Sequence, residues 1–365
     1  MRGFAVAILL AAVSVRAQDV LTIGSVSAAS GGTASVPISI RDVTGTSLGT
    51  DAGTGNRIQG FAFKIMFPAD LVDSIGFTRA GGIAASLTPL YETTLQGDGW
   101  ISYVVSFSEL SNVIPFTPNA PAPGDPIGTL SVTLSPSAAP DSTVPLTFHA
   151  PSAILSNQAG SVLETIAAGN LKLVNGALSV VLGIPGNVIA TAISAAQVNV
   201  AWSAVVNADH YEVWRKVDGG AFASVGTPGA AAFSDMSVVA GKTYLYRVQA
   251  VDGALTSAFS TIDPATTIFF ADDPLVAQTT TVKATHFTQL RTAVNAFRVT
   301  AGLATLPGDP TVAAGLVVRA THVTDLRTAL DAARAAAGVS TLSYTDAVPT
   351  VIKAVHVTEL RNGVK

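Results

Sequence analysis

The amino-acid sequence predicts a mainly β protein with a small helical region at its C-terminal end. From about residue 19 to 268, short runs of alternating apolar and polar residues are separated by Gly, Pro, Asp and Asn, a pattern typical of strands joined by turns. From about 271 to 365, the apolar period becomes that of a helix and recurs in three copies. The composition agrees with this fold class, since 48% of the residues are hydrophobic, only 12% are charged, and 32 are Gly.

The N-terminus has the pattern of an export signal. Arg2 precedes the apolar run "FAVAILLAAVSV", and Val15-Arg16-Ala17 forms a small-x-small cleavage site. This run is too short to cross roughly 30 Å of hydrocarbon. We therefore expect a signal peptide over residues 1–17 with cleavage after Ala17, no membrane span in the mature chain, and an extracellular or cell-surface location.

Charge and cysteine content exclude several classes of function. The formal net charge of −4 provides no basic surface for nucleic acid. The chain has no cysteine, which excludes thiolate nucleophiles, Cys-zinc sites and iron–sulfur clusters. His-Glu-x-x-His, P-loop and dinucleotide-binding motifs do not occur in the sequence. We expect no enzyme and no cofactor.

Residues 19–181 predict a single β-sandwich. The runs "SVPISI", "FAFKIMF" and "WISYVVSF" each send alternate apolar residues to one face. Trp100 falls on the other face, among Ser102 and Ser106, and is a candidate ligand contact. It is either a platform for a sugar ring or a half-buried residue at the end of the sheet.

The acidic residues of this segment do not predict a glycosidase. Such an enzyme needs two carboxylates roughly 5–9.5 Å apart across a cleft. Asp98 and Glu109 flank the same predicted strand, and extended chain at roughly 3.3 Å per residue holds them far apart. The acidic residues are scattered over turns, at Asp70, Asp73, Asp98, Glu109, Asp125 and Asp141.

The order of these runs resembles that of cohesin domains. The stretches concerned are "GGTASVPISI", "IQGFAFKIMFPADLV", "GWISYVVSF", "PIGTLSVTLS" and "NGALSV". The resemblance implies a jelly-roll sandwich, related to carbohydrate-binding modules, that binds dockerin partners through one sheet face and has no catalytic activity. The chain departs from the cohesin pattern at "APAPGDP" and in the insertion "TSLGTDAGTGN".

Residues 184–268 resemble a fibronectin type III domain, an immunoglobulin-like sandwich. The resemblance is carried by "VNVAW", "YEVWRK" and "AGKTYLYRVQAV". It implies that Trp202 and Tyr211 lie in the core and that Tyr244 is the tyrosine-corner residue, bonded back to the backbone.

Trp214 is the second candidate ligand contact. It alternates with Glu212 and Lys216, so we expect it to face outward from the sandwich. There it is either an interface anchor or a packing surface for a neighbouring domain. The sequence has no Arg-Gly-Asp, so integrin-type adhesion is not supported.

Residues 271–365 predict a helical repeat with copies at about 271–306, 307–342 and 343–365, the last one shortened. The stretches "THFTQLRTAVNAFRVTAGL", "THVTDLRTALDAARAAAGV" and "VHVTELRNGVK" each start an apolar stripe at a His. Thr285 and Thr321 precede the His and are candidate N-caps. Gly302 and Gly338 are candidate residues of positive φ after the helices.

The three recurring His residues, His286, His322 and His356, are either metal ligands or structural residues of the first helical turn. We favour the structural role, because Gln289 replaces the acid that follows the His in the other two copies. Each His also lies in the apolar stripe, where a neutral imidazole commonly bonds a backbone carbonyl. No calcium loop of the dockerin type occurs in this region.

An Arg follows each His by five residues. We expect these Arg side chains to pair with the Asp of a neighbouring Asp-Pro, at Asp273-Pro274 or Asp309-Pro310. The three residues are Arg291, Arg327 and Arg361. The units resemble a short repeat at the C-termini of secreted, multi-domain bacterial proteins.

Together these patterns predict an exported, non-catalytic binding or scaffold protein. Its expected partner is a polysaccharide or another secreted or cell-surface protein, at the cell surface or in the polysaccharide-degrading machinery. The alternative is a purely structural component of the cell envelope or matrix, without a specific carbohydrate ligand.

Overall fold

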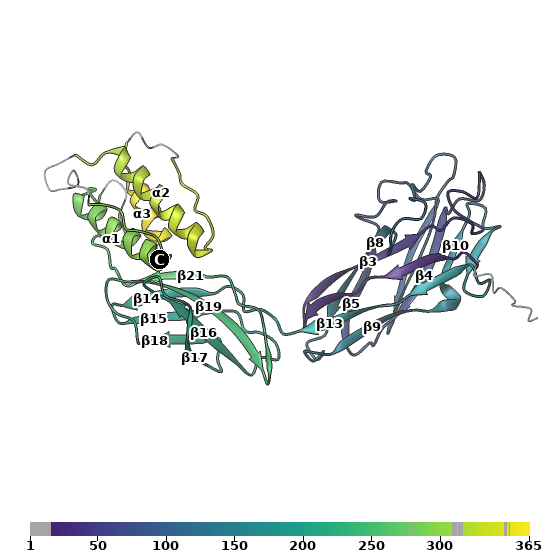
Figure 1. Ribbon diagram of the computed structural model, residues 1–365, viewed down its shortest axis with the longest axis horizontal. Helices are drawn as coiled ribbons and strands as arrows, with labels where there is room; N and C mark the ends of the chain where they lie inside the picture. The colour runs from purple at the N-terminus through teal and green to yellow at the C-terminus, as the bar shows by residue number, and fades with distance from the viewer. Residues whose placement is uncertain (1–15, 277–278, 309–311, 313–316, 347–348, 350) are drawn as a thin grey trace, which may run out of the picture. The chain divides into compact units, whose positions relative to one another are not determined.

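The computed structural model describes residues 16–276, 279–308, 312, 317–346, 349 and 351–365. The chain forms two compact units, of which unit 1 ends at Val181 and unit 2 covers Leu182–Lys365. Both units contain packed β-sheets, and three helices follow at the C-terminal end (Figure 1). The predicted fold class, mainly β with a small helical region, is confirmed. Most of the predicted signal peptide, residues 1–15, lies outside the described residues.

Unit 1 is a sandwich of two sheets. The first sheet has the order β12-β1-β3-β8-β5, with β1 (Asp19–Ile23), β3 (Thr33–Arg41), β5 (Val72–Thr78), β8 (Asp125–Leu134) and β12 (Leu171–Val174). The second has the order β11-β10-β4-β9-β13-β2, and β7 pairs with β4 and β6 with β7. Its strands are β2 (Val26–Ala29), β4 (Gly60–Met66), β6 (Tyr91–Gly97), β7 (Trp100–Ser106), β9 (Thr143–Phe148), β10 (Ile154–Ser156), β11 (Leu163–Thr165) and β13 (Gly176–Val181).

Alternation along the strands builds the core of unit 1. In β3, β4 and β7 the apolar side chains at alternate positions point between the sheets and are removed from water. The first and last strands of the unit meet in both sheets, because β1 pairs in parallel with β12, and β2 with β13. The buried alternate residues are Val36, Ile38, Ile40, Phe61, Phe63, Ile65, Ile101, Tyr103 and Val105.

The β part of unit 2 is a second sandwich. One sheet has the order β14-β15-β18, with β14 (Ile189–Ser194), β15 (Gln197–Ala201) and β18 (Ala232–Asp235). The other has the order β17-β16-β19-β20, and β21 also pairs with β19. Its strands are β16 (His210–Lys216), β17 (Ala223–Gly226), β19 (Thr243–Asp252), β20 (Leu255–Thr256) and β21 (Asp263–Thr266).

Three aromatic residues occupy fixed positions in this second core. The ring of Trp202 meets that of Tyr211 edge to face, with 5.2 Å between centroids. The Tyr211 hydroxyl accepts the backbone N–H of Val205 at 2.8 Å. The Tyr244 hydroxyl accepts the backbone N–H of Val239 at 2.8 Å, five residues upstream, which is the contact of a tyrosine corner.

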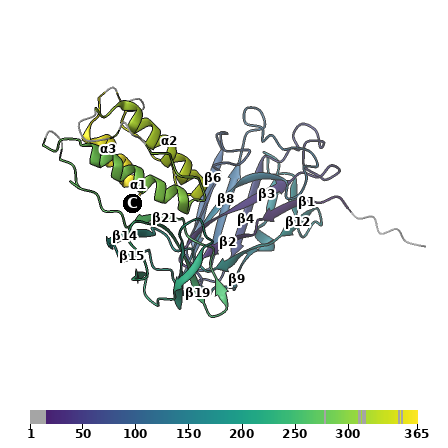
Figure 2. The ribbon, with the colours of Figure 1, turned by 60° about the vertical axis from the view of Figure 1, so that its left-hand side comes forward.

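The helices α1 (Ala284–Thr300), α2 (Ala320–Ala337) and α3 (Ala354–Gly363) pack against one another and, through α1, against β19 (Figure 2). Each buries the apolar stripe that begins at its His. Gly302 and Gly338 have φ of 85° and 71°, the left-handed values predicted for them. In the described part of the chain, no helix has the length and apolar character needed to cross a membrane.

The predicted N-caps Thr285 and Thr321 are wrong. Each Thr is the second residue of its helix, and the N-cap positions are Lys283 and Arg319, whose backbones are extended. These helices start without a Thr cap. Instead, the His at the third helical position accepts the backbone N–H of the N-cap residue.

Strand β19 joins the sandwich of unit 2 to the helices. Tyr244 and Tyr246 point into the sandwich core, whereas Leu245 between them belongs to the core of the helices. The Thr300 hydroxyl, at the end of α1, donates to the buried Thr243 carbonyl at 2.8 Å. It also accepts the Asp218 backbone N–H at 3.3 Å. The helices therefore pack against β19, and this strand contributes side chains to both cores.

We expect Tyr244→Phe to lower the free energy of unfolding of unit 2 by about 1 kcal/mol, because the Val239 N–H loses its partner while the ring stays in place. Urea unfolding followed by fluorescence measures this change. Tyr91→Phe, which alters an exposed hydroxyl in unit 1, is the matched control and should have no effect. An unchanged unfolding midpoint for Tyr244→Phe would contradict the assignment.

Candidate functional site

The outer face of the second sheet of unit 1 is the first candidate surface. The strands β11, β10, β4, β7 and β6 lie side by side, and their alternate side chains point away from the core. We call these side chains the outer face. It consists of Leu163, Thr165, Ile154, Ser156, Ala62, Lys64, Met66, Trp100, Ser102, Val104, Ser106, Tyr91, Thr93 and Leu95.

The outer face is apolar or hydroxyl-bearing, with Lys64 as the one charge among its residues. Tyr91 and Leu95 on the edge strand β6 are 57% and 59% exposed. The acidic residue between them, Glu92, turns to the other side of β6, where its carboxylate accepts the Tyr103 hydroxyl at 2.6 Å and the Arg79 side chain at 2.8 Å. The hydrogen bond from Arg79 lowers the pKa of Glu92. The alternation therefore removes the acid from the outer face.

Trp100 lies on the outer face, at the start of β7, and is half-buried. The Lys64 ammonium sits 4.1 Å from the centroid of its ring, a cation–π contact. The indole also lies against β6, since a Cβ at Gly97 would be 2.4 Å from its Nε1. A sugar platform needs a free ring face, and the lysine occupies one.

The carboxylates flagged in the sequence are not gathered in a substrate cleft. Asp98 and Asp73 both line a cavity of about 170 Å³ and are exposed. This is smaller than the roughly 300–1,000 Å³ of ligand pockets. Glu109 accepts the Gly55 N–H at 2.7 Å and so holds a loop. This arrangement offers no support for glycoside hydrolysis.

Trp214 lies on the face of β16 turned away from the sandwich core and is half-buried. Its Nε1 donates to the Glu212 carboxylate at 3.1 Å, and its ring meets Phe259 edge to face at 5.7 Å. Across the sheet it is paired with Arg247, on the face that the helices cover at Leu245. Trp214 is thus packed among Glu212, Phe259 and Arg247, and less of its ring surface is accessible to an external partner.

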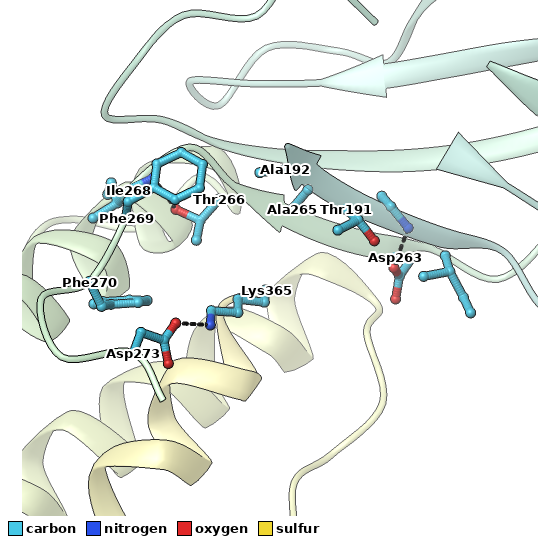
Figure 3. A pocket seen from close by; sticks show the side chains of 12 residues that line it. Thr191, Ala192, Asp263, Ala265, Thr266, Ile268, Phe269, Phe270, Asp273 and Lys365 are labelled. Atoms are coloured by element: carbon cyan, nitrogen blue, oxygen red, sulfur yellow. Dashed lines mark hydrogen bonds and ion pairs between the residues drawn. The ribbon is translucent and has the colours of Figure 1, made fainter. Parts of the chain in front are cut away.

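Unit 2 contains a cavity of about 510 Å³ between β14, β21 and the C-terminal residue (Figure 3). Phe269 and Phe270 lie on one side, and an ion pair between Asp273 and Lys365 lies at its margin. On the strand side the Asp263 carboxylate accepts the Ala190 N–H at 2.8 Å. Burial raises the pKa of Asp263. The cavity has the size of a small-molecule pocket, but its charged groups Asp263, Asp273 and Lys365 already have partners within the chain.

The three recurring His residues cap their own helices. His286, His322 and His356 each occupy the third helical position, and their Nδ1 accepts the backbone N–H of the N-cap residue at 3.1–3.2 Å. This is the second half of a capping box, with His in the place of Glu or Gln. The expected bond to a backbone carbonyl is therefore wrong, since the partner is a backbone N–H.

The other ring nitrogen bonds a carboxylate in the first and third copies. His286 Nε2 lies 3.0 Å from the Asp272 carboxylate, and His356 Nε2 lies 2.9 Å from that of Asp346. Because Nδ1 accepts a hydrogen, Nε2 carries one and donates it. A ring bonded in this way has no lone pair left for a metal, which agrees with a structural role for His286 and His356.

The Arg residues of the repeats connect one copy to the next. Arg361, fully buried, donates to the carbonyls of Ala271 and Asp272 at 2.7 and 2.9 Å and lies 3.5 Å from the Asp273 carboxylate. The third copy thereby contacts the segment that opens the first.

The other two Arg residues follow a related pattern. Arg327 pairs with Glu359 of the third copy at 2.8 Å, rather than with an Asp-Pro aspartate, and also donates to the Asp346 carbonyl. Arg291 donates to the Pro307 carbonyl at 2.9 Å. The predicted partner Asp309-Pro310 lies outside the described residues.

Comparisons with known proteins give likenesses of fold. No protein-family model and no curated protein matches the chain. Among solved structures it is similar to the third cohesin of ScaC from Acetivibrio cellulolyticus, solved with the ScaB dockerin, at 20% identity and TM-score 0.33 over 45% of this chain and 99% of that chain. A cohesin of Clostridium acetobutylicum, CaCohA2, is 16% identical, with TM-score 0.33 over 46% and 92%. An Fn3-like protein from Clostridium thermocellum is 26% identical, with TM-score 0.21 over 22% and 88%.

Sequence reasoning missed the most exposed part of the outer face. Tyr91 and Leu95 stand in "YETTLQG", which forms the edge strand β6. These two apolar residues are four positions apart with Thr93 between them, so the run shows no clear alternation of apolar and polar residues. Its pairing with β7, which the sequence does not show, places Tyr91 opposite Ser106 and Leu95 opposite Ser102 on the outer face.

We expect His356→Ala to lower the free energy of unfolding of unit 2 by about 2 kcal/mol, since it leaves the Lys353 N–H and the Asp346 carboxylate without a buried partner. Thermal unfolding of the full chain measures the loss, and Asn362→Ala, exposed on the same helix, is the control.

Zinc content provides a second measurement on the same proteins. After incubation with zinc and dialysis, elemental analysis of the wild-type chain should find less than one equivalent. One equivalent that is lost in His356→Ala would show that the His residues are ligands.

Proposed function

We propose that this chain is a non-catalytic binding protein whose unit 1 docks a folded protein partner on the outer face. The observation that supports this most is the outer face itself, an open sheet surface with one charge and two exposed apolar side chains on its edge strand. Surfaces depleted in charge and containing exposed aromatic residues are typical of protein interfaces.

The outer face has the features that a docking partner can use. Tyr91 offers a large, rigid side chain at little entropic cost, and Leu95 two positions further lies on the same side. The neighbouring hydroxyl groups of Thr93, Ser102 and Ser106 supply hydrogen bonds to a partner. A partner that covers both kinds of group gains apolar burial without having to desolvate a charge.

The state of Trp100 favours a protein partner over a polysaccharide. Sugar rings stack on a free aromatic face, and Lys64 covers one face of Trp100. The resemblance of residues 19–181 to cohesins agrees with this choice, because it implies docking through one sheet face. We infer that the protein is exported by its signal peptide and acts at the cell surface or within polysaccharide-degrading machinery.

A purely structural role in the envelope or matrix is the second candidate. It is favoured by the C-terminal helices, whose recurring His and Arg residues are used within the chain for capping and packing. In this role the helices and the second sandwich space or anchor the chain, and the outer face has no specific partner.

Binding by the outer face predicts a specific loss on mutation. The full chain, immobilised without residues 1–17, should retain a protein from the culture medium of the organism that encodes it. In the double variant Tyr91→Ala, Leu95→Ala, the affinity for that purified protein should fall at least about tenfold, because two anchors of the interface are removed. Calorimetric titration measures the affinity.

The control is Val174→Ala, which truncates an exposed apolar residue on the opposite sheet and should leave the affinity unchanged. Equal binding by the double variant and the wild type would exclude the outer face. Retention of the chain on insoluble polysaccharide that Trp100→Ala abolishes would instead establish the sugar-binding role.

A further inference from the structure

Three buried acidic residues meet at one end of the unit 1 sandwich. Asp19 begins β1, and Asp42 directly follows β3, its neighbour in the first sheet. Val20 lies opposite Arg41, so the two aspartates come next in the ladder at the same end. Glu164 is the inward-pointing residue of β11, in the other sheet. All three side chains are fully buried.

A single loop is folded around these three carboxylates. Asp19 Oδ1 accepts the Val43 N–H at 2.7 Å, Asp42 Oδ2 accepts the Thr50 N–H at 2.9 Å, and Glu164 Oε1 accepts the Leu48 N–H at 2.9 Å. Residues 43–50, which follow β3, thus supply one donor to each group. This loop includes the start of the insertion "TSLGTDAGTGN", where the sequence departs from the cohesin pattern.

The second oxygen of each carboxylate receives no N–H or hydroxyl donor. Asp19 Oδ2, Asp42 Oδ1 and Glu164 Oε2 are all shielded from water, and the one hydrogen bond within their reach joins the carboxyl groups of Asp19 and Glu164. Buried polar atoms are normally satisfied, and a buried carboxylate without a partner is costly. Within the part of the chain that the structure describes, none of the three forms an ion pair with Lys or Arg. No Lys or Arg therefore offsets the charge of this cluster, so a proton on Asp19 or a bound cation must do so.

The carboxyl groups are close enough to perturb one another. Burial, followed by the neighbouring Glu164 carboxyl group, raises the pKa of Asp19 to about 9, and Asp42 adds to the effect. Neighbouring carboxylates share a proton or attract a cation, because two like charges side by side repel each other.

We propose that Asp19, Asp42 and Glu164 bind one calcium ion. Calcium is a hard cation that takes six to eight oxygen ligands from carboxylates, carbonyls and water, in flexible geometry. When all three carboxylates are ionised, a bound divalent ion lowers the magnitude of their net charge to about 1. The free-energy cost of burying these charges then falls. Zinc sites are usually built with His or Cys, which do not take part here, and magnesium requires a near-ideal octahedron and retains its waters.

Calcium binding requires the three carboxylates to move closer together than they lie in this structure. Among the described residues, no group of three or more His, Asp or Glu side chains is already spaced to hold an ion, this cluster included. The free oxygens must therefore draw together. Gly49, at φ 125°, passes so close to Asp42 that a Cβ would lie 2.2 Å from Oδ1, which only glycine permits. The bound ion ties β1, the loop and β11 together, and so links the two sheets.

Calcium binding to the full chain tests the proposal. After treatment with EDTA and its removal, titration calorimetry with calcium chloride should show one equivalent bound. At about 100-fold excess over the dissociation constant, scanning calorimetry should show the unit 1 transition raised by roughly 5–10 °C. Magnesium at the same concentration should give a markedly smaller shift.

Two variants locate the site. Glu164→Gln keeps the shape of the side chain and should weaken calcium binding at least tenfold. Asp51→Asn alters an exposed carboxylate that accepts the Gly45 N–H in the same loop and should bind as the wild type does. If Glu164→Gln does not fold, the wild-type titration still decides. A stripped wild-type chain that shows no heat and no thermal shift with calcium overturns the proposal, as does unchanged binding by folded Glu164→Gln.

Discussion

Burial of strand β19 on both faces is the constraint on which unit 2 depends. Its even-numbered residues Tyr244, Tyr246 and Val248 form the sandwich core, and Leu245 enters the core of the helices. Without the helices, Leu245 would be left in water. The helices cover this side chain, and the Thr300 hydroxyl bonds the strand's Thr243 carbonyl. The sandwich and the helices are consequently parts of one compact unit.

Without cysteine, the chain fixes its irregular segments with buried polar groups. In the helical region, a His at the third position bonds the N-cap backbone, and a buried Arg361 bonds the carbonyls that precede the first helix. In unit 1, three buried carboxylates bond the loop after β3. In each place a side chain satisfies backbone groups that no helix or sheet could pair. The same device therefore organises both the repeats and the proposed calcium site.

The part of the fold that depends on periodicity was predictable. Alternation placed Ile38, Phe63 and Tyr103 in the core, and the helical period placed Leu290 and Leu326 in the buried stripe. The N-caps were mispredicted, because Thr is a common cap. Nothing local shows that the helix begins one residue before the Thr, or that the His at the third helical position bonds the N-cap backbone. The outer face was only partly predictable, since Trp100 was identified and the exposed Tyr91 and Leu95 on the same face were not.

The sequence by itself determined the fold class, the faces of the strands and the repetition of the helices, because these follow from the spacing of apolar residues within short segments. Only the tertiary structure decided which distant residues meet. Glu164 is far from Asp19 and Asp42 in the sequence and meets them because the start of β1, the end of β3 and the middle of β11 lie at the same end of the sandwich. Sheet pairing brings together residues far apart in the chain, and no local pattern encodes that pairing.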